Sequence, residues 1–167
     1  MLVKLASLDA YLDIETTGLS HQTDVLTVVG VFTDDGAGST LTQLVGDEIT
    51  VDRLLDTFRG VTSLYTFNGS RFDVPFIRNR LGVDLEKGLR HRDLMYDCWD
   101  RGLYGGLKAV ERVLGLRRKL PDMNGLDAIR LWEQYRAADD KEALTRLLEY
   151  NKEDILNLKT LRALLNA

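Results

Sequence analysis

The stretch that decides the fold is Leu8–Leu19, with the sequence LDAYLDIETTGL. It opens with a short apolar run, Leu8–Ile14, of the length typical of a buried β-strand. Asp13 and Glu15 are two residues apart, and side chains so spaced on a strand point to the same face, about 6.5–7 Å apart. Two carboxylates on one side of an apolar strand repel each other and are costly to bury. A divalent cation between them removes both difficulties, since hard cations such as Mg²⁺ bind carboxylate oxygens.

The competing interpretation of this pair is two exposed acids at the end of an ordinary strand. Thr16, Thr17 and Gly18 argue against it, because they form a polar turn in which a ligand could approach the backbone.

Two further segments contain acids that could have either a functional or a purely structural role. Asp73 follows the turn sequence Asn68-Gly69, and with Pro75 just inside the next helix it is also suited to ordinary capping. Tyr150 and Asp154 are four residues apart and share a face if the segment is helical. The alternative interpretation of this pair is a half-buried tyrosine beside a solvated aspartate, without a functional role.

The remaining hydrophobic pattern predicts a single α/β domain over residues 1–167, with a mixed sheet of about five strands and helices on both faces. Besides the first strand, strands are expected over Val25–Thr33, Ser39–Val45, Val61–Phe67 and Leu89–Leu94. Helices are expected over Val51–Phe58, Phe72–Leu81, Leu107–Leu114, Leu126–Tyr135 and Ala143–Leu165. The last helix has a possible break at Tyr150-Asn151, where Asn151 could cap a new helix.

Composition excludes several classes of protein. Apolar residues make up 44% of the 167 residues and charged residues 29%, as in ordinary globular proteins. No apolar run approaches the ~18 residues that span a bilayer, and the first fifteen residues hold no stretch suited to a secretory signal. The single cysteine, Cys98, cannot form an internal disulfide, so we expect a cytoplasmic protein in which this thiol is packed rather than nucleophilic. His21 and His91 lack the spacing of metal ligands.

Charge is distributed unevenly along the chain, although the net charge is only −4. Residues 1–70 contain 3 Lys or Arg and 10 Asp or Glu, whereas residues 71–119 contain 12 and 7. This pattern suggests a polyanion that binds one face, although solvated faces that simply differ would give the same numbers. The candidates for a basic track along a nucleic-acid strand are Arg71, Lys108, Arg112, Arg117, Arg118 and Lys119.

The acidic segments, in this order, resemble the three motifs of the DEDD superfamily of 3′–5′ exonucleases, which have the ribonuclease-H-like fold. The motifs are Asp13–Leu19 (DIETTGL), Asn68–Asp73 (NGSRFD) and Tyr150–Asp154 (YNKED). The superfamily divides by its third motif, and a tyrosine four residues before the last aspartate is similar to the tyrosine (DEDDy) branch. The histidine of the other branch is replaced by Glu149. With its short length and the segment His91–Leu94 (HRDL), the chain looks most like small stand-alone predicted exonucleases.

The resemblance implies four metal ligands, Asp13, Glu15, Asp73 and Asp154, and two divalent cations, Mg²⁺ or Mn²⁺. In such sites the two ions lie about 3.5–4 Å apart, activate a water and stabilise the departing oxygen. By resemblance, Asp13 bridges both ions and Asp73 serves the leaving-group side. Glu15 and Asp154 complete the nucleophile side.

Further residues are implied to hold substrate and water. Tyr150 would orient the attacking water, because a phenol with an ordinary pKa near ~10 is a poor base at neutral pH. Thr16, Thr17, Leu19 and Asn68 would hold the terminal nucleotide. The implied reaction is removal of nucleoside 5′-monophosphates from the 3′ end of nucleic acid, with single-stranded DNA or RNA as the expected substrate.

Three alternatives to this function are open. The first is a non-catalytic nucleic-acid-binding module on the same fold, which would not need all four acids and the tyrosine. The second is an endonuclease or the nuclease part of a larger assembly. The third is a metal-dependent phosphohydrolase of free nucleotides, which would act on a mononucleotide but not on oligomers.

Overall fold

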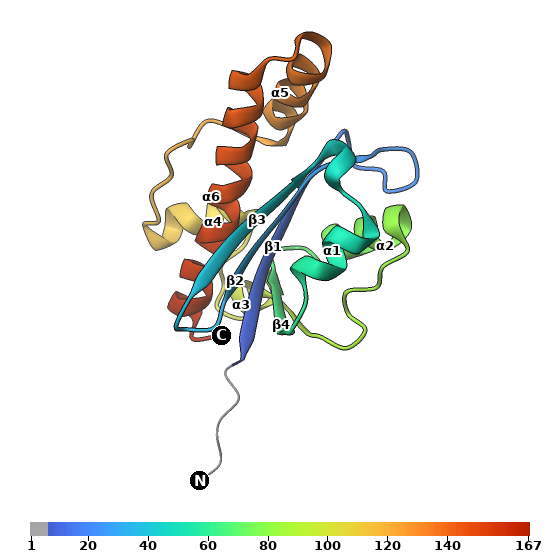
Figure 1. Ribbon diagram of the computed structural model, residues 1–167. Coiled ribbons are helices and arrows are strands. Elements are labelled where there is room, and N and C mark those ends of the chain that lie inside the picture. Colours follow the sequence, from blue (N-terminus) through green and yellow to red (C-terminus); the bar gives the residue numbers. More distant parts are fainter. Residues whose placement is uncertain (1–6) are drawn as a thin grey trace.

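A five-stranded mixed sheet forms the centre of the protein in a computed structural model that describes residues 7–167 (Figure 1). The strand order is β3-β2-β1-β4-β5, in which β1 pairs antiparallel with β2 and parallel with β4. The predicted α/β fold with a mixed sheet is confirmed. The strands are β1 Leu8–Thr16, β2 Leu26–Asp34, β3 Ser39–Val45, β4 Val61–Thr66 and β5 Arg90–Asp93.

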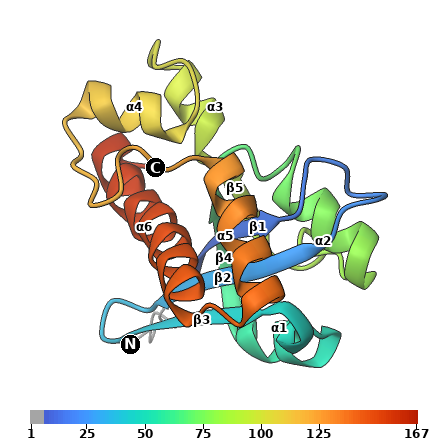
Figure 2. The ribbon, with the colours of Figure 1, turned by 90° about the horizontal axis from the view of Figure 1, so that it is seen from above.

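Helices cover both faces of the sheet (Figure 2). One face packs against α1 Val51–Thr57 and α2 Asp73–Leu81. A 3-10 turn, Gly46–Glu48, precedes α1. Four helices lie on the other side of the sheet: α3 Leu94–Trp99, α4 Leu107–Leu114, α5 Gly125–Ala138 and α6 Lys141–Leu165.

The alternation of side chains along β1 divides this strand between the two layers. Ala10, Leu12 and Ile14 belong to the core cluster with α1 and α2, whereas Tyr11 packs with residues of α3, α4 and α6. Since successive side chains of a strand point to opposite faces, Asp13 and Glu15 lie on the same face as Tyr11, toward α6. The strand that anchors the core therefore also presents two acids to the C-terminal helix.

The last helix corrects one expectation. α6 runs without interruption from Lys141 to Leu165, so the predicted break at Tyr150-Asn151 is wrong. Asn151 is fully buried inside the helix, and its amide donates a hydrogen bond to the carboxylate of Asp13 at 2.9 Å instead of capping a new helix. This hydrogen bond to a side chain of β1 compensates for the cost of burying a polar side chain in the middle of a helix.

The remaining elements begin and end within a few residues of their predicted positions, but α3 was not predicted. It is a single short helix that begins after Asp93, whose carboxylate accepts a hydrogen bond from the Met95 amide at 3.1 Å. Within α3, Cys98 is fully buried and burial raises the pKa of its thiol to about 11, in agreement with a packed thiol.

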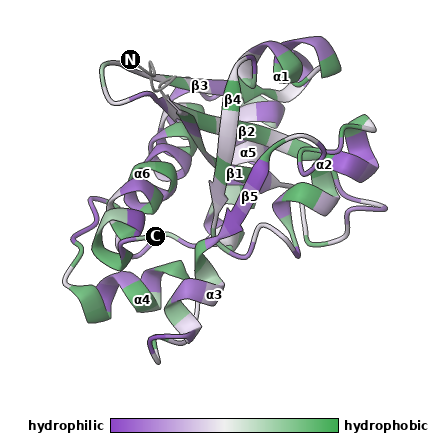
Figure 3. Ribbon diagram, turned by 90° about the horizontal axis from the view of Figure 1, so that it is seen from below, coloured by the Kyte–Doolittle hydropathy of each residue, from purple (hydrophilic) through white to green (hydrophobic). Residues whose placement is uncertain are grey.

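The sheet edge at β5 is hydrophilic (Figure 3), with the sequence Arg-His-Arg-Asp. Charged side chains on an edge strand discourage pairing with another sheet. Within residues 7–167, none of the helices combines the length and the apolar character that a bilayer-spanning segment needs.

Candidate active site

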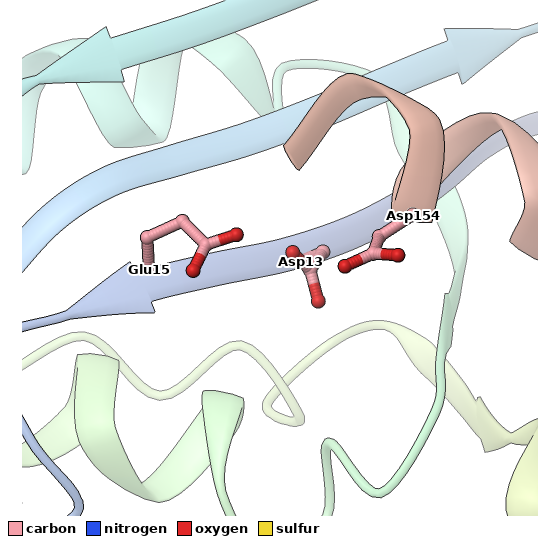
Figure 4. Close-up of side chains that lie close together, drawn as sticks. All are labelled: Asp13, Glu15 and Asp154. Atoms are coloured by element: carbon pink, nitrogen blue, oxygen red, sulfur yellow. The ribbon is translucent and has the colours of Figure 1, made fainter. Parts of the chain in front are cut away.

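Three carboxylates from the two ends of the chain meet on the α6 face of β1. Asp13 and Glu15 come from β1 and Asp154 from α6, and Figure 4 shows the three side chains lying close together. One oxygen of each lies within 4.8 Å of the others. Glu15 and Asp154 are buried, and Asp13 is half-buried. The spacing expected from the sequence thus brings both acids of β1 to one face, and α6 adds the third.

Asp73, the fourth predicted acid, lies beside this group rather than within it. It is the first residue of α2. Its carboxylate accepts a hydrogen bond from the Ile14 amide of β1 at 3.1 Å. This contact turns the carboxylate toward the strand of the other acids.

The four acids and Tyr150 line one pocket of about 430 Å³. Of the residues expected to hold a nucleotide, Thr16, Leu19 and Asn68 also line it. Thr17 does not line the pocket, because its hydroxyl accepts from the Val25 amide at 3.0 Å and lies 3.3 Å from an oxygen of Asp24. The opposite wall, which sequence reasoning did not identify, is formed by residues at and near the start of α5: Asn124, Gly125, Leu126 and Ile129.

Burial raises the pKa of every acid in the pocket, and repulsion by neighbouring acids adds to this effect. The pKa values of Asp13 and Glu15 lie well above their ordinary range, chiefly because of burial and then because of Asp154. Burial raises the pKa of Asp73 to about 7 and that of Asp154 to about 6, the latter against the opposing effect of Arg118. The ionised forms of these acids are therefore disfavoured, because the pocket holds too little compensating positive charge.

The same burial keeps Tyr150 protonated. Burial, followed by the charges of Asp154, Glu15 and Asp13, raises the pKa of its phenol far above the ordinary value. At neutral pH its hydroxyl can donate a hydrogen bond but cannot act as a base.

The residues fit a divalent cation. The Oε1 atom of Glu15 is buried and has no hydrogen-bond partner among residues 7–167, although buried polar atoms are normally paired. Carboxylate oxygens that converge within a few ångströms are the donor set that hard cations prefer. A cation held by Asp13, Glu15 and Asp154 would satisfy the unpaired oxygen and favour the ionised form of all three.

A family model described as the RNase H superfamily matches residues 10–166 of the chain. The chain belongs to the RNase H superfamily. A comparison with curated protein sequences gives no match.

Solved structures with a similar fold include nucleases and a polymerase. They are the family B DNA polymerase from the hyperthermophilic archaeon Pyrobaculum calidifontis (17% identity, TM-score 0.69), NrnC of Brucella melitensis with bound Mg²⁺ (19%, 0.62) and a zinc-bound complex of E. coli ExoI with single-stranded DNA (15%, 0.50). These matches cover 95%, 98% and 91% of this chain, but only 24%, 73% and 45% of the other chains. At such identities the likeness concerns the fold, and the predicted ribonuclease-H-like fold of the DEDD exonucleases is confirmed.

Asn151 also belongs to the candidate site, although the sequence analysis did not identify it there. Its Nδ2 donates to the backbone oxygen of Asp13 at 3.1 Å and to Oδ2 of the same residue at 2.9 Å. Its Oδ1 in turn accepts from Nε2 of Gln43 at 2.9 Å. Asn151 of α6 therefore fixes the Asp13 side chain, and Gln43 of β3 in turn orients Asn151. The sequence held a signal for this role, since Asn151 stands next to Tyr150 on a helix with an apolar stripe.

Asp93 performs a similar task for the second motif. Its Oδ1 accepts from the Asn68 amide at 2.7 Å, and its Oδ2 accepts from the amide and hydroxyl of Ser70. Asn68 adopts a positive φ of 59°, which costs energy for a residue other than glycine. The carboxylate of Asp93 therefore holds the loop between β4 and α2 in the conformation that presents Asn68 to the pocket.

Proposed function

We propose that the chain is a metal-dependent 3′–5′ exonuclease that hydrolyses phosphodiester bonds and releases nucleoside 5′-monophosphates. The observation that carries this proposal is the meeting of Asp13, Glu15 and Asp154 in one pocket with Asp73 and Tyr150. Membership of the RNase H superfamily and the shared fold of NrnC and ExoI support a nuclease.

The four acids Asp13, Glu15, Asp73 and Asp154 would hold two divalent cations, Mg²⁺ or Mn²⁺. When bound, such ions supply a more acidic water and stabilise the leaving oxygen. Tyr150 would donate a hydrogen bond that orients the attacking water. This role agrees with the raised pKa of its phenol, because the donor stays protonated throughout the physiological range.

The pocket also suggests where the terminal nucleotide would lie. Leu19 is 86% exposed at the pocket mouth, and an apolar side chain so exposed is suited to contact with a base. Thr16 would bind the nucleotide from the end of β1, where the first loop of the pocket begins, and Asn68 from the loop that follows β4. Thr17 would then act by closing the first of these loops through its hydrogen bonds with Asp24 and Val25.

One gel experiment tests the proposal. Single-stranded DNA, duplex DNA and RNA, each labelled at the 5′ end, are incubated with Mg²⁺, Mn²⁺ or EDTA. Stepwise shortening of the labelled strand in the presence of metal is the expected result. Cleavage of a mononucleotide phosphate without cleavage of oligomers would favour a phosphohydrolase, and binding without cleavage would favour a non-catalytic module.

The matched variants are Asp13→Asn and Asp122→Asn. Asp13→Asn should abolish cleavage while the fold stays intact, because the amide relieves repulsion among the acids and can still accept a hydrogen bond from Asn151. Asp122 is an exposed acid outside the pocket, so its variant should retain full activity. Near-normal turnover by Asp13→Asn would show that the site is wrongly assigned.

A further inference from the structure

A buried ion pair behind the pocket has no part in the function proposed above. Arg118 lies between α4 and α6, and its side chain is only 5% exposed. Its Nη1 donates to both carboxylate oxygens of Glu111, at 2.9 and 2.7 Å. Its Nη2 donates to Oδ1 of Asp154. Arg118 therefore joins a metal-ligand candidate to a second, more deeply buried carboxylate.

Glu111 is the unexpected member of this group. It lies on α4, is fully buried, and accepts a further hydrogen bond from Nδ2 of Asn157 at 2.9 Å. Burial of a carboxylate costs several kcal/mol unless it is paired, and an apolar side chain at this position would avoid that cost. Sequence reasoning gave Glu111 no role and placed Arg118 on the exposed track, which its burial contradicts.

The charges around Arg118 explain why a second carboxylate is useful. A guanidinium beside Asp154 fixes the orientation of the carboxylate through a rigid, planar set of donors. Alone, however, its positive charge would repel a divalent cation in the same pocket. Glu111 compensates for this charge from the side away from the pocket. Glu153 contributes less, because it lies 3.5 Å from Nε and binds the backbone amides of Lys119 and Leu120.

We propose that Glu111 and Arg118 are positioning residues that act as a neutral pair, which orients Asp154 for metal binding without lowering the negative charge of the pocket. The inference rests on the proposed function, because it concerns the affinity of the same acids for a divalent cation. In this proposal Glu111 acts through Arg118 and contacts neither metal nor substrate.

The test is the binding of Mn²⁺ to the free protein, measured by electron paramagnetic resonance. Glu111→Gln keeps the shape of the side chain but leaves Arg118 less compensated, so we expect the Kd for Mn²⁺ to rise about tenfold, as for other residues that support metal ligands. Glu133→Gln is the matched control, since Glu133 is an exposed carboxylate on α5, and its Kd should equal that of the wild type. Circular dichroism establishes that each variant is folded.

A second variant separates charge from packing. Glu111→Leu/Arg118→Met removes both charges and leaves an apolar contact, a replacement that buried ion pairs often tolerate. We expect it to bind Mn²⁺ more tightly than Glu111→Gln, because no uncompensated cation remains. A Kd for Glu111→Gln within threefold of the wild type would overturn the inference, as would a double variant that binds no better than Glu111→Gln.

The wild type provides the distinction from the proposed function. If the wild type binds no Mn²⁺, or if Asp13→Asn does not abolish its binding, the proposed function fails. If it does bind Mn²⁺ and Glu111→Gln behaves like the wild type, only the further inference fails.

Discussion

Tyr150 shows how its surroundings decide what a single side chain can do. Its ring lies 4.7 Å from Nζ of Lys108 and 5.8 Å from the guanidinium carbon of Arg118, while its hydroxyl shares a pocket with four acids. The two cations stabilise the ring face, while burial and, after it, the negative charge of the acids keep the phenol protonated. The residue is therefore held as a hydrogen-bond donor.

Tyr150→Phe should slow cleavage by roughly 10²-fold, the lower end for positioned acid–base groups, and leave Mn²⁺ affinity unchanged. The reason is that phenylalanine keeps the ring contacts and loses only the hydroxyl. Single-turnover rates and metal titrations measure the two quantities separately. Asp154→Asn should reduce both the cleavage rate and the affinity for Mn²⁺. Equal losses of rate and affinity in the two variants would contradict the separate roles of Tyr150 and Asp154.

The raised pKa values of the acids predict a dependence of stability on pH. Asp73 and Asp154 have pKa values of about 7 and about 6 in the folded protein, but close to 4 in an unfolded chain. Between these values the folded protein holds protons that the unfolded chain has released. The free energy of unfolding should therefore fall as the pH rises from about 4 to about 7 in EDTA.

Thermal melts between pH 4.5 and 8 measure this effect, and Asp73→Asn should make the fall shallower. Mg²⁺ at pH 7 should restore stability, because the cation favours the ionised acids. A Tm that climbs steadily with pH in EDTA would contradict the assignment of raised pKa values.

At the scale of elements, the close approach of α6 to the sheet depends on a missing side chain. Gly30 of β2 lies directly opposite Asp13 of β1 in the antiparallel register. A Cβ atom at this position would lie 2.1 Å from Oδ1 of Asn151 and 2.3 Å from Cδ1 of Ile155. Glycine is therefore required here for packing, and its position allows Asn151 to reach Asp13.

Gly30→Ala should lower the free energy of unfolding by about 1–3 kcal/mol, as overpacking does in other cores, and should also reduce cleavage because Asn151 must move. Chemical denaturation and the exonuclease assay measure the two effects. Gly38→Ala is the matched control, because a Cβ atom there would meet no atom within 4 Å. Equal stability of the two variants would contradict the packing argument.

The pattern of elements could be predicted largely from local signals, and the failures have physical causes. Thr50 caps α1 and Gly82 ends α2, and signals of this kind can be recognised in a sequence because they act within a few residues. Asn151 led to the wrong prediction of a helix break, because a polar residue inside an apolar stripe resembles a cap. Its partner, Asp13, lies 138 residues away in the sequence, so local signals could not reveal it. The candidate acids could be recognised from motif spacing. Their supporting partners Gln43, Asp93 and Glu111 were not, because only the fold brings them close.

At the scale of the whole molecule, the basic segment is divided by burial. Arg117 and Lys119 are exposed and line a second pocket of about 430 Å³ beside α6, together with Arg146 and Lys152. Arg118 between them points inward. Only the outer residues of this run are therefore suited to contact phosphates of a strand.

Arg117→Ala/Lys119→Ala should weaken binding of an oligonucleotide in Ca²⁺ and reduce the slope of log affinity against log salt by about two, because each of the two side chains would neutralise one phosphate. Affinities at several salt concentrations, on two unrelated sequences, measure this. Arg59→Ala, at an exposed position on the α1 side of the molecule, is the control. A slope unchanged by the double variant would remove these residues from the track.

The three-carboxylate group joins residues from distant parts of the sequence, and this has a consequence for protein synthesis. β1 leaves the ribosome first and the segment with Asp154 follows about 140 residues later, a delay of roughly 7–30 seconds at usual rates of translation. During that interval the nascent chain already holds Asp13 and Glu15 but lacks the third acid. The cluster can be completed only after α6 has been made, so the protein cannot assemble this candidate cation site ahead of its fold.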